Sequence, residues 1–231
     1  MKTIGMLGGM SWESSSVYYQ LINREVQRRL GGIHSAKALM YSFDFDEIER
    51  LQNAGRWDEA TARLVEAGMR LARGGADFLM ICCNTMHLMA GAVEREAGVP
   101  LLHIADATGA AIAARGLTRV GLLGSRFTVQ NGGIVIDRLE ERFGVEVLVP
   151  EADDRAEVHR IIVEELVRGR FCEASRATHR RIIEGLVAAG AQGVILGCTE
   201  IPLLVKAEDA EVPLFDTTAL HALAAVDMAL A

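Results

Sequence analysis

The chain has 231 residues, half of them hydrophobic, and a formal net charge of −7. A chain of this size and composition can bury one large or two modest α/β cores without disulfide or metal support. Lysines and arginines are scattered among acidic residues, which argues against nucleic acid as a partner, and no apolar stretch approaches the ~18 residues of a membrane span. The first residues lack the apolar core of a signal peptide, so we expect a cytoplasmic protein with no membrane partner.

The first half of the chain alternates between predicted strands and helices. A strand at residues 4–8 leads into a glycine-rich turn, Gly8-Gly9-Met10-Ser11, and serines there can cap the helix that follows. A strand at 38–43, a short helix from Asp44 and a helix at 57–71 come next. The apolar run at 75–83 then predicts a buried strand that ends at Cys83.

The second half repeats this order. We predict a strand at 119–123, a helix at about 131–143, a strand at 145–149 and helices at 157–167 and 174–189. The apolar run at 190–198 ends at Cys198, and a last helix at about 218–230 is expected to pack back on the first half. Such alternation predicts the α/β class, with open parallel sheets flanked by helices.

The two halves match each other as an internal repeat. Both apolar runs begin at a Gly-Ala pair, and each reaches its cysteine at the same spacing. Two more segments recur in the same order: Ile4-Gly5-Met6-Leu7-Gly8 as Val120-Gly121-Leu122-Leu123-Gly124, and Val99-Pro100-Leu101-Leu102 as Val212-Pro213-Leu214-Phe215. We therefore predict two pseudo-symmetric βα domains, residues 1–107 with 217–231 and residues 108–216.

The four cysteines do not suggest a disulfide scaffold or a metal site. They are few for this length, and a reducing compartment would keep them as thiols. Cys82 and Cys83 are adjacent, so on a strand their side chains would point to opposite faces and could not share a metal ion. We expect Cys82 to be core packing.

Cys83 and Cys198 are the predicted catalytic pair. Ligands bind at the carboxyl ends of the strands in open parallel sheets, so one thiol per half suggests a pocket with sulfur on two opposing walls. Inversion of a carbon that bears hydrogen needs a base on one face and an acid on the other, and two thiols can supply both. Either cysteine alone would more often be packing, but the repeat favours catalysis.

Polar residues near the two cysteines are the predicted substrate contacts. Asn84 and Thr85 follow the first thiol, Thr199 and Glu200 follow the second, and all offer groups for an α-carboxylate. Glu200 could instead be an acid/base group or a partner of a helix dipole. The remaining predicted contacts lie elsewhere in the two halves: Met10, Gln52, Thr128 and Arg168.

Two of these side chains, Arg168 and His87, could also have a purely structural role. Arg168 is either a solvated cation at a helix end or a clamp for a second carboxylate. His87 is assigned a supporting role, in which it orients a loop or caps a backbone group. His34, His103 and His221 are isolated, with no spacing that suggests a metal site.

At these residues the chain resembles the aspartate/glutamate racemase family, within the superfamily that includes hydantoin racemases, maleate isomerases and arylmalonate decarboxylases. The resemblance covers nearly the full length and rests on Gly5-Met-Leu-Gly-Gly-Met-Ser-Trp-Glu13, Cys83-Asn-Thr-Met-His87, Gly121-Leu-Leu-Gly124 with Phe127-Thr128, and Leu196-Gly-Cys-Thr-Glu-Ile201. It implies a racemase without cofactor, an active site in the cleft between two α/β domains, and a homodimer. It also implies Cys83 and Cys198 as the acid/base pair, with Asn84, Thr85, Thr128, Thr199 and Glu200 lining the substrate site.

Three departures refine the resemblance. The second motif reads Cys-Thr-Glu, whereas glutamate racemases of cell-wall synthesis typically carry Cys-Thr-His, so that subtype is disfavoured. Some relatives carry threonine in place of Cys83, and a cysteine here favours racemisation in both directions. Residues 129–134 are small and apolar, whereas relatives have an acidic segment that contains aromatic residues. The choice between aspartate and glutamate as the substrate therefore stays open.

Two other functions remain compatible with the sequence. One is isomerisation or decarboxylation of a dicarboxylate such as maleate, in which the two cysteines would have unequal roles. The other is a binding protein that holds an amino acid without reaction.

Overall fold

The computed structural model describes residues 1–129 and 134–231. The chain packs as two compact units, Met1–Ile104 with His221–Ala231, and Ala105–Leu220. Each unit holds a four-stranded, fully parallel sheet flanked by helices, which confirms the predicted α/β class. No helix in the described part of the chain is long and apolar enough to cross a membrane.

The sheet of the first unit has the strand order β2-β1-β3-β4. Its strands are β1 (Ile4–Gly8), β2 (Ala38–Ser42), β3 (Phe78–Ile81) and β4 (Leu101–Leu102). The helices between them are α1 (Trp12–Leu30), α2 (Phe45–Asn53), α3 (Trp57–Arg73), the 3₁₀ helix η1 (Thr85–Met89), α4 (Ala90–Ala97) and the start of α5 (Ile104–Ala113).

The second unit has the matching strand order β6-β5-β7-β8. Its strands are β5 (Arg119–Leu123), β6 (Glu146–Leu148), β7 (Val194–Leu196) and β8 (Leu214–Asp216). Its helices are α6 (Arg126–Val129), α7 (Ile134–Phe143), α8 (Ala152–Glu164), η2 (Leu166–Arg168), α9 (Glu173–Ala188), α10 (Ile201–Leu204) and η3 (Ala207–Asp209), and α11 (Thr217–Leu230) starts here.

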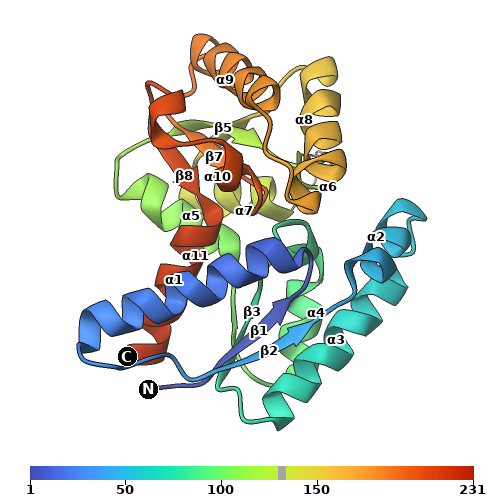
Figure 1. Cartoon of the computed structure of the whole chain (residues 1–231), viewed down its shortest axis with the longest axis vertical. Coiled ribbons are helices and arrows are strands. Elements are labelled where there is room, and N and C mark those ends of the chain that lie inside the picture. The colour runs from blue at the N-terminus through green and yellow to red at the C-terminus, as the bar shows by residue number, and fades with distance from the viewer. Residues whose placement is uncertain (130–133) are drawn as a thin grey trace. The chain divides into compact units, whose positions relative to one another are not determined.

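Alternating side chains on the central strands divide each unit into two cores. In β3, Leu79 and Ile81 pack toward α3 and α4, whereas Phe78 and Met80 pack toward α1 and α11. Figure 1 shows α3 and α4 on one side of this sheet and α1 on the other. Because both faces are covered, the central strands read as continuous apolar runs rather than as alternating ones.

The second unit is layered in the same way. Val194 and Leu196 of β7 face the core shared with α8, α9 and α10, and Ile195 faces the core shared with α5 and α7. Within each sheet, the two central strands therefore end at the same edge, and a turn follows each of them there.

Candidate active site

The first thiol turn, Cys83-Asn84-Thr85, lies just beyond β3. The strand ends at Ile81, two residues earlier than the sequence suggested, and the backbone N–H of Cys82 still donates to the carbonyl oxygen of Leu7 at 2.9 Å. Cys82 is fully buried, and burial raises the pKa of its thiol. Cys83 is half-buried and packs against the opposite core, so the turn presents one inert cysteine and one accessible one.

Asn84 and Thr85 continue the turn and are almost fully buried, at 3% and 8% exposure. Thr85 begins η1 and Asn84 is its N-cap, so both residues directly follow Cys83 at the carboxyl edge of the sheet. His87, on the same 3₁₀ helix, is hydrogen-bonded to backbone groups. Its Nδ1 lies 2.8 Å from the carbonyl oxygen of Cys83, and its Nε2 accepts from the N–H of Ile104 at 3.1 Å.

The glycine-rich turn after β1 shares this edge, because β1 and β3 are paired neighbours. The N–H of Gly9 donates to the hydroxyl of Ser15 at 2.8 Å, and that hydroxyl donates to the carbonyl oxygen of Ser11 at 2.8 Å. Gly9 has φ of +83°, and a Cβ there would collide with the backbone of Phe43. Only glycine fits this position without strain.

Met10 and Gln52, two predicted substrate contacts, lie in the core near η1, the helix that follows the first thiol turn. Met10 is 3% exposed and belongs to the same core cluster as Met86 and Met89 of η1. Gln52 of α2 is 7% exposed, and its amide Nε2 lies 2.9 Å from the sulfur of Met86. A role for either side chain in substrate binding stays a prediction.

The second thiol turn, Cys198-Thr199-Glu200, follows β7 in the same way. The strand ends at Leu196, and the N–H of Gly197 donates to the carbonyl oxygen of Leu123 at 2.6 Å. A Cβ on Gly197 would lie 2.5 Å from a methyl group of Leu122, so the turn leaves the sheet over a position that has room only for glycine. Cys198 is half-buried, as Cys83 is.

Glu200 sits against the second thiol. Its Oε2 accepts hydrogen bonds from the Cys198 thiol at 2.9 Å and from the Thr199 hydroxyl at 3.0 Å. The side chains of Thr199 and Glu200 are only 3% and 2% exposed. In this contact the thiol is the donor and the carboxylate the acceptor, so the hydrogen bond is available to Cys198 as a thiol and not as a thiolate.

Thr128 also lies at the second thiol turn. It is 3% exposed, its hydroxyl is 3.2 Å from that of Ser125, and it contacts the place that a Cβ of Gly197 would occupy. The sequence did not single out Ser125, although its position beside Gly124 matches that of Gly9 beside Gly8 in the repeat. The predicted departure at residues 129–134 falls mainly on 130–133, which lie outside the described residues.

Arg168 is exposed and ends η2, where its N–H donates to the carbonyl oxygen of Glu165 at 3.0 Å. The preceding Leu166 shares a core cluster with Ile201 and Leu204 of α10, the helix that follows the second thiol turn. Arg168 therefore lies on a segment packed beside that turn, with its guanidinium in solvent.

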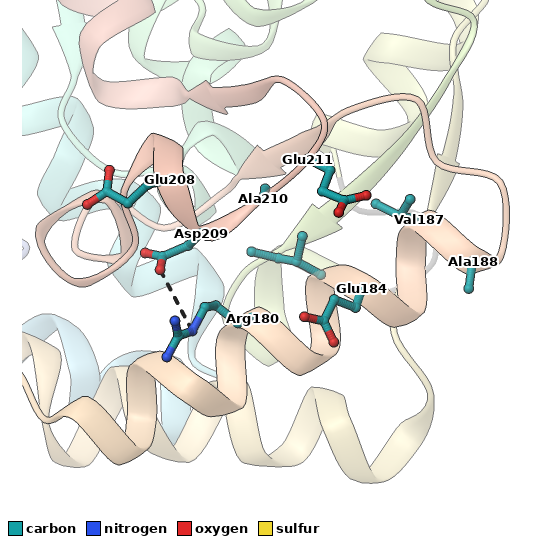
Figure 2. Close-up of a pocket in the computed structure, with 9 residues that line it drawn as sticks. Arg180, Glu184, Val187, Ala188, Glu208, Asp209, Ala210 and Glu211 are labelled. Carbon is teal, nitrogen blue, oxygen red and sulfur yellow. Dashed lines mark ion pairs between the residues drawn. The ribbon is translucent and has the colours of Figure 1, made fainter.

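A separate cavity of about 550 Å³ lies on the second unit, between α9 and the segment that precedes β8. Figure 2 shows Arg180 and Asp209 facing each other there, with Glu184 and Glu211 at the rim. Segments that precede parallel strands lie at the amino edge of a sheet, so this cavity is at the opposite edge from Cys198. It contains none of the predicted site residues.

No group of three or more His, Cys, Asp or Glu side chains in the described part of the chain is placed to hold a metal ion. All four cysteines are outside disulfides. The two turns offer acid/base and hydrogen-bonding groups: a thiol in each unit, a carboxylate beside Cys198, and several buried hydroxyl and amide groups.

Comparison with known proteins identifies the family. The profile of the Asp/Glu/Hydantoin racemase family matches residues 7–225. A Yersinia pestis crystal structure described as a candidate Asp/Glu racemase is 52% identical, with 100% of both chains covered and a TM-score of 0.92. An aspartate racemase homologue from Pyrococcus horikoshii OT3 is 35% identical, with 100% of both chains covered and a TM-score of 0.83.

A curated relative is similar over its full length as well. The broad specificity amino-acid racemase of Bacillus subtilis is 23% identical, and the match covers 99% of this chain and 98% of that protein. The chain therefore belongs to the Asp/Glu/Hydantoin racemase family and is an amino-acid racemase, an isomerase.

Proposed function

We propose that the protein racemises an acidic amino acid, aspartate or glutamate, without pyridoxal phosphate, and that Cys83 and Cys198 are its two acid/base groups. The observation that carries the proposal is the equivalent placement of two half-buried thiols, each two residues beyond a central strand of its own sheet. The 52% identity to a protein described as a candidate Asp/Glu racemase supports the acidic substrate.

The proposed chemistry conserves protons. In one direction the Cys83 thiolate takes the α-proton and becomes a thiol, while the Cys198 thiol gives its proton to the opposite face of the α-carbon and becomes a thiolate. In the other direction the two sulfurs exchange roles. The hydrogen bond from Cys198 to Glu200 supports Cys198 as the thiol that is protonated at rest.

The carboxylates of the substrate need hydrogen-bond donors in the site. We propose that Asn84, Thr85, Thr128 and Thr199 bind the α-carboxylate, because hydrogen bonds to it also stabilise the negative charge that develops when the α-proton leaves. Arg168 is proposed as the partner of the side-chain carboxylate. An Arg168→Met variant then raises KM for aspartate and glutamate and leaves KM for any neutral substrate unchanged.

The test is proton exchange in deuterated water. Pure protein is incubated with each L- and D-amino acid, and loss of the α-proton signal is followed together with chiral chromatography. We expect exchange and racemisation with aspartate, glutamate or both. Lack of exchange with every amino acid, or turnover of maleate without any amino-acid exchange, would contradict the proposal.

Single cysteine variants test the mechanism. Cys83→Ala and Cys198→Ala should each lower kcat by about 10²–10⁴-fold, the usual contribution of a positioned acid or base. Cys172→Ala is the matched control, because Cys172 is exposed at the start of α9, and its activity should equal that of the wild type. Full activity in either of the first two variants would refute the paired-thiol mechanism.

We further propose that the protein is a cytoplasmic homodimer. Light scattering coupled to size-exclusion chromatography gives the molar mass directly, and a mass equal to that of one chain would contradict the dimer. Cell fractionation followed by immunoblotting tests the compartment.

A further inference from the structure

The buried ring of His87 connects the first thiol turn to the segment that follows β4. His87 is 0% exposed and lies four residues after Cys83. Its Nδ1 is 2.8 Å from the carbonyl oxygen of Cys83, and its Nε2 is 3.1 Å from the backbone nitrogen of Ile104. One ring thus holds two backbone groups from separate segments of the first unit.

These partners determine where the ring proton is. A carbonyl oxygen can only accept, so Nδ1 carries the hydrogen in the contact with Cys83. The backbone N–H of Ile104 can only donate, so Nε2 presents its lone pair there. His87 is therefore neutral with its hydrogen on Nδ1, and protonation of Nε2 would set two donors against each other.

A second histidine extends this arrangement. His221 donates from Nε2 to the carbonyl oxygen of Leu102 at 3.0 Å and accepts at Nδ1 from the hydroxyl of Tyr18 at 3.1 Å. Its ring centroid is 5.5 Å from that of His87. The segment on which His87 anchors the thiol turn is thus itself held to α1 and α11 by buried hydrogen bonds.

The second thiol turn differs in the residue at the position of His87. Four residues after Cys198 the chain has Pro202, which has no ring nitrogen to offer. The carbonyl oxygen of Cys198 instead accepts from the N–H of Ile201 at 3.1 Å. The two halves of the repeat therefore hold their thiols by different means: a histidine bridge in the first, and backbone bonds with the Glu200 carboxylate in the second.

We propose that His87 is a positioning residue for Cys83, which fixes the thiol turn by bridging the Cys83 carbonyl oxygen to the N–H of Ile104. It exchanges no proton with substrate. The proposal rests on the proposed function in one respect, that Cys83 is a reacting thiol. Misplacement of a reacting group by about 1 Å can cost about 10²-fold in rate, so a bond that fixes this turn is a determinant of activity.

The test measures how fast iodoacetamide alkylates Cys83 and Cys198 in the same sample, read peptide by peptide by mass spectrometry. In His87→Phe, which keeps a ring but loses both hydrogen bonds, the turn is released and Cys83 alkylation at pH 8 becomes about tenfold faster. Cys198 is unchanged, and kcat/KM for the substrate falls by about ten- to a hundredfold. Faster alkylation together with lower kcat/KM means that the Cys83 thiol is still reactive but is misplaced for the substrate. Loss of the thiol itself would lower both rates.

Two conservative variants each keep one of the two hydrogen bonds of His87. They keep the test decisive if His87→Phe does not fold. Asparagine can place an amide N–H close to the position of Nδ1 and so keep the bond to Cys83. Glutamine reaches the position of Nε2 and keeps only the bond to Ile104. We expect both alkylation and kcat/KM of His87→Asn to lie closer to the wild type than those of His87→Gln.

His179 provides the matched control. It is equally buried, and its Nδ1 bonds the carbonyl oxygen of Ser175, four residues earlier, at 2.8 Å. His179→Phe therefore removes the same kind of bond in the second unit and should leave Cys83 alkylation unchanged. A ¹⁵N-histidine spectrum of the wild type at pH 7 should show His87 with hydrogen on Nδ1 only.

Each other outcome overturns the proposal: unchanged Cys83 alkylation in His87→Phe and His87→Gln, equal changes at both cysteines, the same effect in His179→Phe, or a His87 ring protonated on both nitrogens. Failure of the proposed function is recognised separately. Full activity in Cys83→Ala removes Cys83 from the reaction, whereas the alkylation rates and the spectrum report on the bridge without any turnover.

Discussion

Cys198 and Cys83 occupy equivalent places in the repeat, and the residues that follow them differ. The Cys198 thiol donates to the Glu200 carboxylate at 2.9 Å, and Thr199 donates to the same oxygen. The repeat in the sequence predicts equivalent cysteines and also shows that the next residues differ, Asn-Thr against Thr-Glu. Which atom each of these side chains contacts depends on the turn geometry, and the sequence alone left Glu200 with three possible roles.

Glu200→Gln tests whether the carboxylate controls the second thiol. Glutamine keeps the size of the side chain but removes the negative charge that disfavours a neighbouring thiolate. We expect alkylation of Cys198 by iodoacetamide at pH 7 to become at least about threefold faster, with Cys83 in the same sample unchanged. Equal rates at Cys198 in the variant and the wild type would mean that the carboxylate does not act on this sulfur.

His221 makes the stability of the first unit depend on pH. Burial lowers the pKa of this histidine to about 4, whereas an unfolded chain would titrate it near 6.5. Between these values the unfolded state binds a proton that the folded state does not, so stability falls as the pH falls from about 6.5 to about 4. Well above pH 6.5 the histidine is neutral in both states and the effect disappears.

The expected loss from this residue is about 2 kcal/mol between pH 7 and pH 5. It is measured by urea unfolding with tryptophan fluorescence, because Trp12 and Trp57 both lie in the first unit. In His221→Phe the decrease in the free energy of unfolding between pH 7 and pH 5 should be smaller by about 2 kcal/mol. His34→Gln, at an exposed position, is the control, and an identical pH dependence in all three proteins would contradict the assignment.

At the scale of elements, the turn that follows β1 depends on a glycine. Gly9→Ala introduces a side chain at φ of +83° and against the backbone of Phe43, which should cost about 2 kcal/mol or more. Gly91→Ala is the matched control. Gly91 is an exposed position inside α4 with open space around its Cα, so alanine should stabilise the protein by about 0.5–1 kcal/mol. Urea unfolding checks both signs, and a neutral Gly9→Ala would show that the turn can rearrange.

Long apolar runs and helices with strong periodicity were predictable, and their ends were less so. The helix predicted at 57–71 is α3, Trp57–Arg73, and the one predicted at 174–189 is α9, Glu173–Ala188. The helix predicted at 157–167 begins earlier, at Ala152, because its first turn is polar and carries no apolar period. It ends as an α-helix at Glu164 and continues as η2, where Glu165 has φ of −120°.

The two thiol strands illustrate the limit of such patterns. Each apolar run continues to its cysteine, but β3 and β7 end two residues earlier. A strand continues only as far as its neighbours pair with it, and the last paired residues are Ile81 with Leu7 and Leu196 with Leu123 and Asp216. Pairing partners come from distant parts of the chain, so hydrophobicity alone could not locate these ends.

At the scale of the whole molecule, the core of the first unit is completed by a segment that follows the second unit in sequence. Ala222, Ala225, Val226 and Ala229 of α11 pack with Ile4, Tyr18 and Phe78. The sequence predicted this return from the position of the last helix after the second copy of the repeat.

Ala225→Asp tests this packing. A carboxylate in place of a fully buried methyl group should destabilise the first unit by more than about 3 kcal/mol, since it would place a charge within an apolar core. Leu223→Asp is the control on the same helix, because Leu223 is 39% exposed and should tolerate the change. Tryptophan fluorescence during urea unfolding distinguishes the two, and equal stability would mean that α11 is dispensable for this core.

The segment His221–Ala231 also sets an order of events during synthesis. The ribosome delivers Met1–Ile104 before α11, so α1 alone covers its face of the first sheet until α11 emerges and completes that core. By then all of Ala105–Leu220 has been made. During translation of the second unit Ile4, Tyr18 and Phe78 therefore lack their packing partners on α11, and this is the interval in which a chaperone has a surface to bind.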